Sequence, residues 1–195
     1  MIKAVLFDVD GVLVKGELFS EQLFRDYGIK IPGDFFENEF EEALVGKKDL
    51  KDVIGPYLKE WGWEKGVDAM IDYWLNVSQT TDQELLQIVQ KLQSKDIKCF
   101  VVTNQEKYRA EFLAEEMAFG LLFDDFFASG QIGYKKPQKE FFQHVLNKIG
   151  LKGEEVLYFD DSVGYLETAK SLGIKAFLYT NSKKLIQTLD KYQLL

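Results

Sequence analysis

Short apolar runs, each too short for a helix, recur along this chain and restrict what it can fold into. The first is IKAVLF at residues 2–7, which ends abruptly in acidic residues and a glycine. Similar runs lie at residues 97–102 (IKCFVV), 126–128, 156–159 (VLYF) and 174–178 (IKAFL). Apolar runs of this length, bounded by turn residues, are typical of strands buried inside a sheet.

Helical patterns separate most of these runs. A capping box, TDQE at residues 81–84, precedes a helix with apolar residues on one face. Residues 140–149 and 166–172 also have helical spacing, and each stretch is followed by a glycine. Strands that alternate with helices need crossover connections. We therefore predict an α/β fold, a Rossmann-like parallel sheet flanked by helices.

Residues 15–80 interrupt this alternation. They contain helix-like stretches but no convincing strand, and the stretches lie near residues 18–27, 34–44, 50–61 and 67–76. Such a segment between the first two strands reads as an insertion at the carboxyl edge of the sheet. We predict a small all-helical cap at residues 15–80 and a catalytic core formed by residues 1–14 and 81–195.

The composition limits which binding partners and which cellular compartment we expect for this protein. The chain has 24 basic and 32 acidic residues, a net charge of −8, which disfavours binding to nucleic acid. A single cysteine, Cys99, allows no disulfide framework or thiolate metal cluster, and its place in an apolar run predicts burial. No stretch approaches the ~20 apolar residues that span a bilayer, and the start does not read as a signal peptide. We expect a cytoplasmic protein, a monomer or weak homo-oligomer, with a small ligand and no membrane or nucleic-acid partner.

Polar side chains follow the first four predicted strands. They are Asp8 and Asp10 after the first, Thr103 and Asn104 after the second, Lys135 and Lys136 beyond the third, and Asp160, Asp161 and Ser162 after the fourth. Parallel strands place their carboxyl ends at one edge, where ligands of open sheets bind. Taken singly, each group can be explained without a function, as a helix cap, a turn residue or a solvent-exposed lysine pair. Their joint occurrence in order at the strand ends favours a site.

These residue types together suit phosphoryl chemistry. Clustered carboxylates repel one another and require a cation, and oxygen ligands of this kind suit Mg²⁺. A lysine beside them keeps the carboxylates ionised and can hold an anionic substrate. A carboxylate can attack phosphorus, and a second carboxyl two residues later can transfer protons.

The motifs FDVDG (7–11), VTN (102–104), KKP (135–137) and FDDS (159–162) resemble the four motifs of the haloacid dehalogenase-like (HAD) hydrolase superfamily. The resemblance extends over the whole chain, including a small helical cap between the first two motifs. It implies that Asp8 is the nucleophile and a Mg²⁺ ligand. It also implies that Asp10 is the general acid/base, with its backbone carbonyl on the metal.

The same resemblance assigns the remaining motif residues. Thr103 and Asn104 would bind the transferring phosphoryl group, and Lys136 would steady that group and the nucleophile. Asp161 would be a direct metal ligand, and Asp160 would reach the metal mainly through water. The order of these two aspartates stays open.

Two positions qualify the resemblance. Members that cleave carbon–halogen or carbon–phosphorus bonds lack an acid two residues after the nucleophile, so Asp10 points to phosphate esters. Relatives with Asp-Asp-Ser often carry asparagine three residues after the serine, where this chain has Tyr165. We expect that change to affect local packing or the pocket wall.

The expected function is that of a HAD-type phosphoric monoester hydrolase. It would be a Mg²⁺-dependent phosphatase that hydrolyses a small phosphorylated metabolite through an aspartyl-phosphate intermediate. A phosphomutase acting on a sugar phosphate is the nearest alternative. An inactive phosphate-binding protein or a signalling receiver-like protein is an alternative of another class, although receivers place the acidic pair and the phosphoacceptor in a different order.

Overall fold

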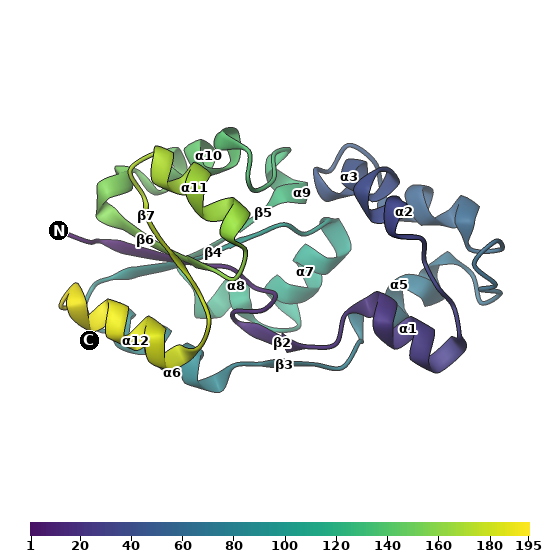
Figure 1. Cartoon of the computed structure of the whole chain (residues 1–195), viewed down its shortest axis with the longest axis horizontal. Coiled ribbons are helices and arrows are strands. Elements are labelled where there is room, and N and C mark those ends of the chain that lie inside the picture. Colours follow the sequence, from purple (N-terminus) through teal and green to yellow (C-terminus); the bar gives the residue numbers. More distant parts are fainter.

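A five-stranded parallel sheet forms the centre of the protein, as a computed structural model covering residues 1–195 shows (Figure 1). Its strands are β1 (Ala4–Phe7), β4 (Lys98–Thr103), β5 (Asp125–Ala128), β6 (Val156–Asp160) and β7 (Lys175–Leu178). Their spatial order is β5-β4-β1-β6-β7, and every neighbouring pair is parallel. Each strand coincides with one of the apolar runs, and the predicted Rossmann-like α/β fold is confirmed.

Helices cover both faces of this sheet. They are α6 (Gln83–Gln93), α7 (Lys107–Glu115), α8 (Phe119–Leu122), α9 (Ser129–Ile132), α10 (Lys139–Ile149), α11 (Val163–Ser171) and α12 (Ser182–Lys191). In Figure 1, α6 and α12 lie below the sheet, and α10 and α11 lie above it. Val5 and Phe7 of β1 pack into the lower apolar cluster, whereas Ala4 and Leu6 pack into the upper one. Alternate side chains of a strand point to opposite faces, so a run buried on both sides must be apolar throughout.

The start of α6 differs from the predicted capping box. Asp82 caps this helix and accepts hydrogen bonds from the N–H groups of Glu84 (3.1 Å) and Leu85 (3.2 Å). Thr81, the residue expected at the cap, instead pairs with Val14 in a strand. Asp and Thr are both good caps, and the strand pairing of Thr81 decides between them.

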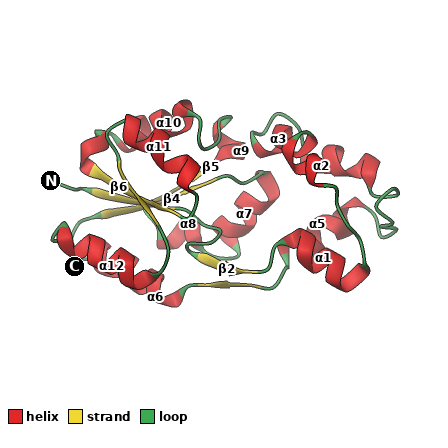
Figure 2. Ribbon diagram, viewed as in Figure 1, coloured by secondary structure: helices red, strands yellow, loops and turns green.

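A helical segment lies between β1 and β4, beyond the carboxyl ends of the strands (Figure 2). It consists of α1 (Phe19–Tyr27), α2 (Gly33–Glu37), α3 (Glu39–Leu44), α4 (Leu50–Ile54), a 3₁₀ turn (Gly55–Tyr57) and α5 (Val67–Leu75). Fifteen buried side chains form an apolar cluster within this segment, separate from the two clusters that flank the sheet. None of the helices in the protein combines the length and apolar character that crossing a bilayer requires.

A two-stranded antiparallel ribbon carries the chain into and out of the helical segment. It pairs β2 (Val14–Gly16) with β3 (Gln79–Thr81). This ribbon departs from the prediction that residues 15–80 contain no strand. Its strands are only three residues long and pair across more than sixty positions, so no local alternation marks them in the sequence.

Three polar contacts fasten the helical segment to the sheet region. The Ser129 hydroxyl donates to the Leu44 carbonyl oxygen at 2.6 Å, and the Tyr108 hydroxyl donates to the Asp49 carboxylate at 2.8 Å. Lys135 forms an ion pair with Glu41 on α3. The helical segment is therefore closed against the carboxyl edge of the sheet.

Candidate active site

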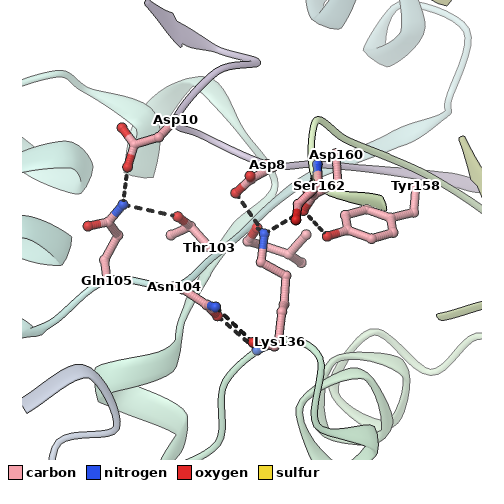
Figure 3. A network of polar contacts seen from close by, with 10 residues as sticks. Asp8, Asp10, Thr103, Asn104, Gln105, Lys136, Tyr158, Asp160 and Ser162 are labelled. Carbon is pink, nitrogen blue, oxygen red and sulfur yellow. Dashed lines mark hydrogen bonds and ion pairs between the residues drawn. The ribbon is translucent and has the colours of Figure 1, made fainter. Parts of the chain in front are cut away.

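Lys136 lies at the centre of a buried polar network at the ends of β1 and β6 (Figure 3). Its Nζ is 2.7 Å from Asp8 Oδ1 and 2.7 Å from Asp160 Oδ2, and it donates to the Val102 carbonyl oxygen at 3.2 Å. The lysine is 1 % exposed and Asp160 is fully buried. The structure thus brings together residues from all four motifs identified in the sequence.

The electrostatics of this network leave an excess of negative charge. Burial raises the pKa of Asp8 to about 7; the Lys136 ammonium opposes this shift and the Asp160 charge reinforces it. Burial and the Asp160 carboxylate also raise the pKa of Asp161. The pKa of Lys136 is raised because its two carboxylate partners outweigh the effect of burial. One ammonium therefore faces three carboxyl groups, and a further cation would relieve their repulsion.

The three carboxyl groups can converge on one metal ion. One oxygen each of Asp8, Asp160 and Asp161 lie within 4.8 Å of one another. Hard carboxylate oxygens grouped in this way fit Mg²⁺, which commonly takes one or two protein carboxylates and keeps water in its other positions. The donor set and its spacing therefore fit the metal that the sequence motifs imply.

Asp160 and Asp161 differ in how many hydrogen bonds their carboxylate oxygens accept. Asp160 accepts hydrogen bonds from Lys136, from the Tyr158 hydroxyl and from the Ser162 N–H at 2.7 Å. Asp161 is exposed. This difference favours the expectation that Asp161 contacts a metal directly and that Asp160 acts through water.

Gly11 makes room for the Asp161 carboxylate. Its φ of +79° lies in the left-handed region, and a Cβ at this position would lie 2.0 Å from Asp161 Oδ2. A side chain here would be strained and would displace the carboxylate. The glycine after Asp10 is therefore required by the close approach of the fourth motif to the first.

Thr103 is the last residue of β4, and Asn104 follows it beside this network. Thr103 is buried, and its hydroxyl lies within hydrogen-bond distance of Gln105 Nε2 (3.4 Å). The Asn104 side chain makes two hydrogen bonds with the Lys136 backbone, one to its carbonyl oxygen (2.9 Å) and one from its N–H (2.8 Å). The amide group of Asn104 thus holds the segment that presents Lys136.

Asp10 points away from the acidic cluster and toward Gln105 (Figure 3). Its carboxylate accepts hydrogen bonds from Gln105 Nε2 at 2.6 Å and from Arg109 Nη2 at 3.3 Å. Arg109 also contacts Gln79 on β3, and its Nη1 is buried without a partner. These contacts hold the Asp10 carboxylate apart from Asp8.

Sequence reasoning missed several residues of this arrangement. Gln105 directly follows the second motif, and Arg109 lies four residues farther along, in the first turn of α7. Tyr158 lies two residues before Asp160 on β6, and alternation along a strand places both on one face. Tyr165, in contrast, was expected to affect local packing or the pocket wall, and its ring lies 5.1 Å from Lys136 Nζ.

A cavity of about 570 Å³ extends from this edge of the sheet to the helical segment. Asp10, Gly11, Gln105 and Arg109 line its sheet side. Aromatic side chains from α1, α2, α3 and α5 line the opposite side. A ligand in this cavity would touch Asp10 at one end and the helical segment at the other.

A polar cluster at the carboxyl edge of a parallel sheet, beneath an inserted helical segment, places the protein among α/β enzymes that bind ligands at the strand ends. Residues 2–173 match the sequence profile of the haloacid dehalogenase-like hydrolases. The chain belongs to this family and is a hydrolase.

Named relatives align over most of the chain. A sesquiterpene phosphatase of Aspergillus oryzae is 26 % identical over 187 residues, which cover 92 % of this chain and 91 % of that protein. A glyceraldehyde 3-phosphate phosphatase of Methanocaldococcus jannaschii is 28 % identical over 192 residues, covering 89 % of this chain and 83 % of that enzyme. Both named relatives are phosphatases.

Solved structures share the whole architecture. A HAD-like family hydrolase of Porphyromonas gingivalis superposes with a TM-score of 0.81 at 23 % identity, covering 98 % of both chains. A HAD-family enzyme of Bacteroides thetaiotaomicron, solved as a mutant with magnesium and inorganic phosphate, gives 0.80 at 17 % identity and covers 95 % of this chain and 99 % of its own. These likenesses extend the agreement in fold to the inserted helical segment.

Proposed function

We propose that the protein is a Mg²⁺-dependent phosphatase that hydrolyses an organic phosphomonoester through an aspartyl-phosphate on Asp8. The observation that carries this proposal is the separation of the two carboxylates of the first motif. Lys136 holds Asp8 in the acidic cluster, whereas Gln105 and Arg109 hold Asp10 at the cavity. The phosphatase names of the relatives support the same reaction class.

In this proposal Asp8, Asp161 and the Asp10 backbone carbonyl would hold the metal, and Asp160 would act on it through water. Bound Mg²⁺ would supply positive charge to the phosphoryl oxygens and relieve the carboxylate repulsion. The complex of the Bacteroides enzyme with magnesium and inorganic phosphate supports magnesium as the metal.

The residues of the chain divide the reaction into two steps. An Asp8 oxygen attacks phosphorus, the ester P–O bond breaks, and Asp10 gives its proton to the departing alkoxide oxygen. Asp10 then takes a proton from water, the water oxygen attacks phosphorus, and Asp8 is released together with inorganic phosphate. Lys136 and Thr103 hold the nucleophile and the phosphoryl group in line, and Asn104 contributes by holding the segment that presents Lys136.

We also propose that residues 15–80 act as a cap on a core formed by residues 1–14 and 81–195. Closure of the helical segment over the site would exclude water and place its residues against the organic group of the substrate. The Ser129–Leu44 and Tyr108–Asp49 hydrogen bonds support a closed state.

Rapid mixing of two variants with p-nitrophenyl phosphate and Mg²⁺ tests the proposed roles. Nitrophenolate leaves without a proton, so Asp10→Ala should release a burst of nitrophenol approaching one equivalent of enzyme, followed by slow turnover. Asp8→Asn should give no burst, because an amide is a poor nucleophile. A burst from Asp8→Asn would place the nucleophile elsewhere. Free phosphate as the product from sugar phosphates would support a hydrolase, whereas an isomerised sugar phosphate would indicate a mutase.

A further inference from the structure

The cavity beneath the helical segment has one polar end and one apolar end. Asp10, Gln105 and Arg109 occupy the polar end, next to the atoms that would handle phosphate. The volume of about 570 Å³ lies within the range of ~300–1,000 Å³ that is usual for pockets enclosing an organic ligand. The cavity therefore has room for an organic group well beyond the phosphate.

The apolar end is an aromatic wall formed by Phe19, Phe36, Phe40 and Trp74. The Trp74 ring is stacked on Phe19 with centroids 4.0 Å apart and lies 5.4 Å from Phe40. Phe36, Phe40 and Trp74 are only half-buried and line the cavity. These three rings are thus not fully covered by packing within the helical segment, and their free apolar surface faces the cavity.

Charged groups near this wall are already paired. Lys15 lies 2.5 Å from Asp82, and Glu17 is bound to Arg25. Gln79, Gln105 and Arg109 also line the cavity, but they are hydrogen-bonded to one another or to Asp10 at the polar end, and Ser20 is the only hydroxyl-bearing residue in the lining. A sugar buried against this wall would leave most of its hydroxyl groups without partners, which is costly, whereas an apolar group would gain from burial.

We propose that the substrate is the phosphate monoester of an apolar alcohol, with an alkyl, alkenyl or aromatic group of about six or more carbons seated against the aromatic wall. This inference rests on the proposed phosphatase function and specifies its substrate class. The reacting phosphate lies at Asp8 and Asp10, and the carbon chain extends from there toward Trp74. Hydroxyl-rich phosphates are poor substrates because the wall offers few hydrogen bonds.

A series of n-alkyl phosphates tests this inference with one unchanged reacting centre. We expect kcat/KM to rise about two- to fourfold per methylene from ethyl to octyl phosphate, at concentrations below micelle formation. Hexyl phosphate should exceed glucose 6-phosphate, which has the same number of carbons but several hydroxyl groups. A flat or falling series, or a preference for glucose 6-phosphate, would overturn the inference.

Variants show which residues cause the preference for long chains. The quantity to compare is the ratio of kcat/KM for octyl phosphate to kcat/KM for ethyl phosphate, because any loss of folded enzyme cancels in this ratio. Phe40→Ala should lower this ratio about tenfold, and Leu18→Asn, at a 62 % exposed lining position, about threefold. Phe24→Asn is the matched control, because Phe24 lies on α1 and is 58 % exposed but does not line the cavity. It should keep the wild-type ratio, and an equal fall in this control would contradict the proposed location.

Binding separates a failure of this inference from a failure of the proposed function. If neither p-nitrophenyl phosphate nor any alkyl phosphate is hydrolysed, the phosphatase proposal fails. Calorimetric titration with ethyl, butyl, hexyl and octyl phosphonate then tests whether the pocket binds apolar chains. Affinity that increases with chain length would support the apolar pocket, and affinity independent of chain length would overturn it.

Discussion

Replacing Lys136 by methionine removes the one positive charge of the buried network while keeping a side chain of similar length. The ammonium contacts Asp8 and Asp160 at 2.7 Å each and is almost fully enclosed. The variant therefore leaves two buried carboxyl groups facing each other without a nearby fixed cation.

The expected loss of stability follows from that geometry. Removing one partner of a buried ion pair costs about 3–5 kcal/mol, because the remaining charge is uncompensated. Asp8, with its pKa raised to about 7, can take up a proton after the substitution, which sets the cost toward the lower end. For a chain of 195 residues this corresponds to a fall in Tm of about 6–20 °C. The loss of kcat/KM should be about 100- to 1,000-fold.

Two measurements check these values. Thermal unfolding in EDTA reports the stability without metal, and initial rates with p-nitrophenyl phosphate and Mg²⁺ report the activity. Lys135→Met is the matched control, since that side chain is partly exposed and pairs with Glu41 rather than with the acidic cluster. A pair of this kind is worth ~1 kcal/mol or less. In an Asp8→Asn background, Lys136→Met should cost less than in the wild type, because one of the two uncompensated charges is already absent.

Equal losses of stability and activity in the two lysine variants would refute this reasoning. They would mean that the charge of Lys136 does not compensate the acidic cluster.

Three further outcomes are expected. Mg²⁺ at a hundredfold excess over its Kd should stabilise the protein by about 2.7 kcal/mol, seen as a higher Tm, and full activity in excess EDTA would contradict the metal site. Burial would raise the pKa of Asp124, but hydrogen bonds from the Cys99 N–H and from Lys98 outweigh burial and hold this pKa below its usual value. The ionised Asp124 carboxylate therefore stabilises the fold above pH ~4. Asp124→Asn should lower the free energy of unfolding by about 1–3 kcal/mol at pH 7, and the difference from wild type should shrink as the pH falls below 4. A difference in unfolding free energy that stayed constant with pH would contradict this role of Asp124. Burial raises the pKa of the Cys99 thiol far above its usual value, so a thiol reagent should label the native protein at pH 8 much more slowly than the urea-unfolded chain.

The sequence predicted the sheet because each buried strand must be apolar on both faces. That requirement leaves a local pattern, and strands such as β1 and β6 coincide with it. The ribbon of β2 and β3 left no such pattern, because its pairing depends on residues distant in the chain. The same distant pairing moved the cap of α6 from Thr81 to Asp82.

The candidate site was predictable to the extent that it depends on the ends of strands. Asp8 directly follows β1 and Asp160 ends the neighbouring β6, and a parallel sheet brings those ends together. The partners of Asp10 were not predictable in this way. Gln105 and Arg109 reach Asp10 only because α7 lies against the first motif, and neither residue type signals that contact in the sequence.

The register of the ribbon has a consequence for how this architecture can diversify. Gly16 pairs with Gln79, so the chain leaves the sheet region and returns to it at adjacent points. A two-residue turn could join those positions as an ordinary β-hairpin and replace everything from residue 17 to residue 78. Segments of other sizes could be grafted at the same point without changing the register of the five-stranded sheet. The ribbon is thus a site at which the inserted segment, which would contact the organic group of the substrate, can be replaced without altering the sheet region that would contact phosphate.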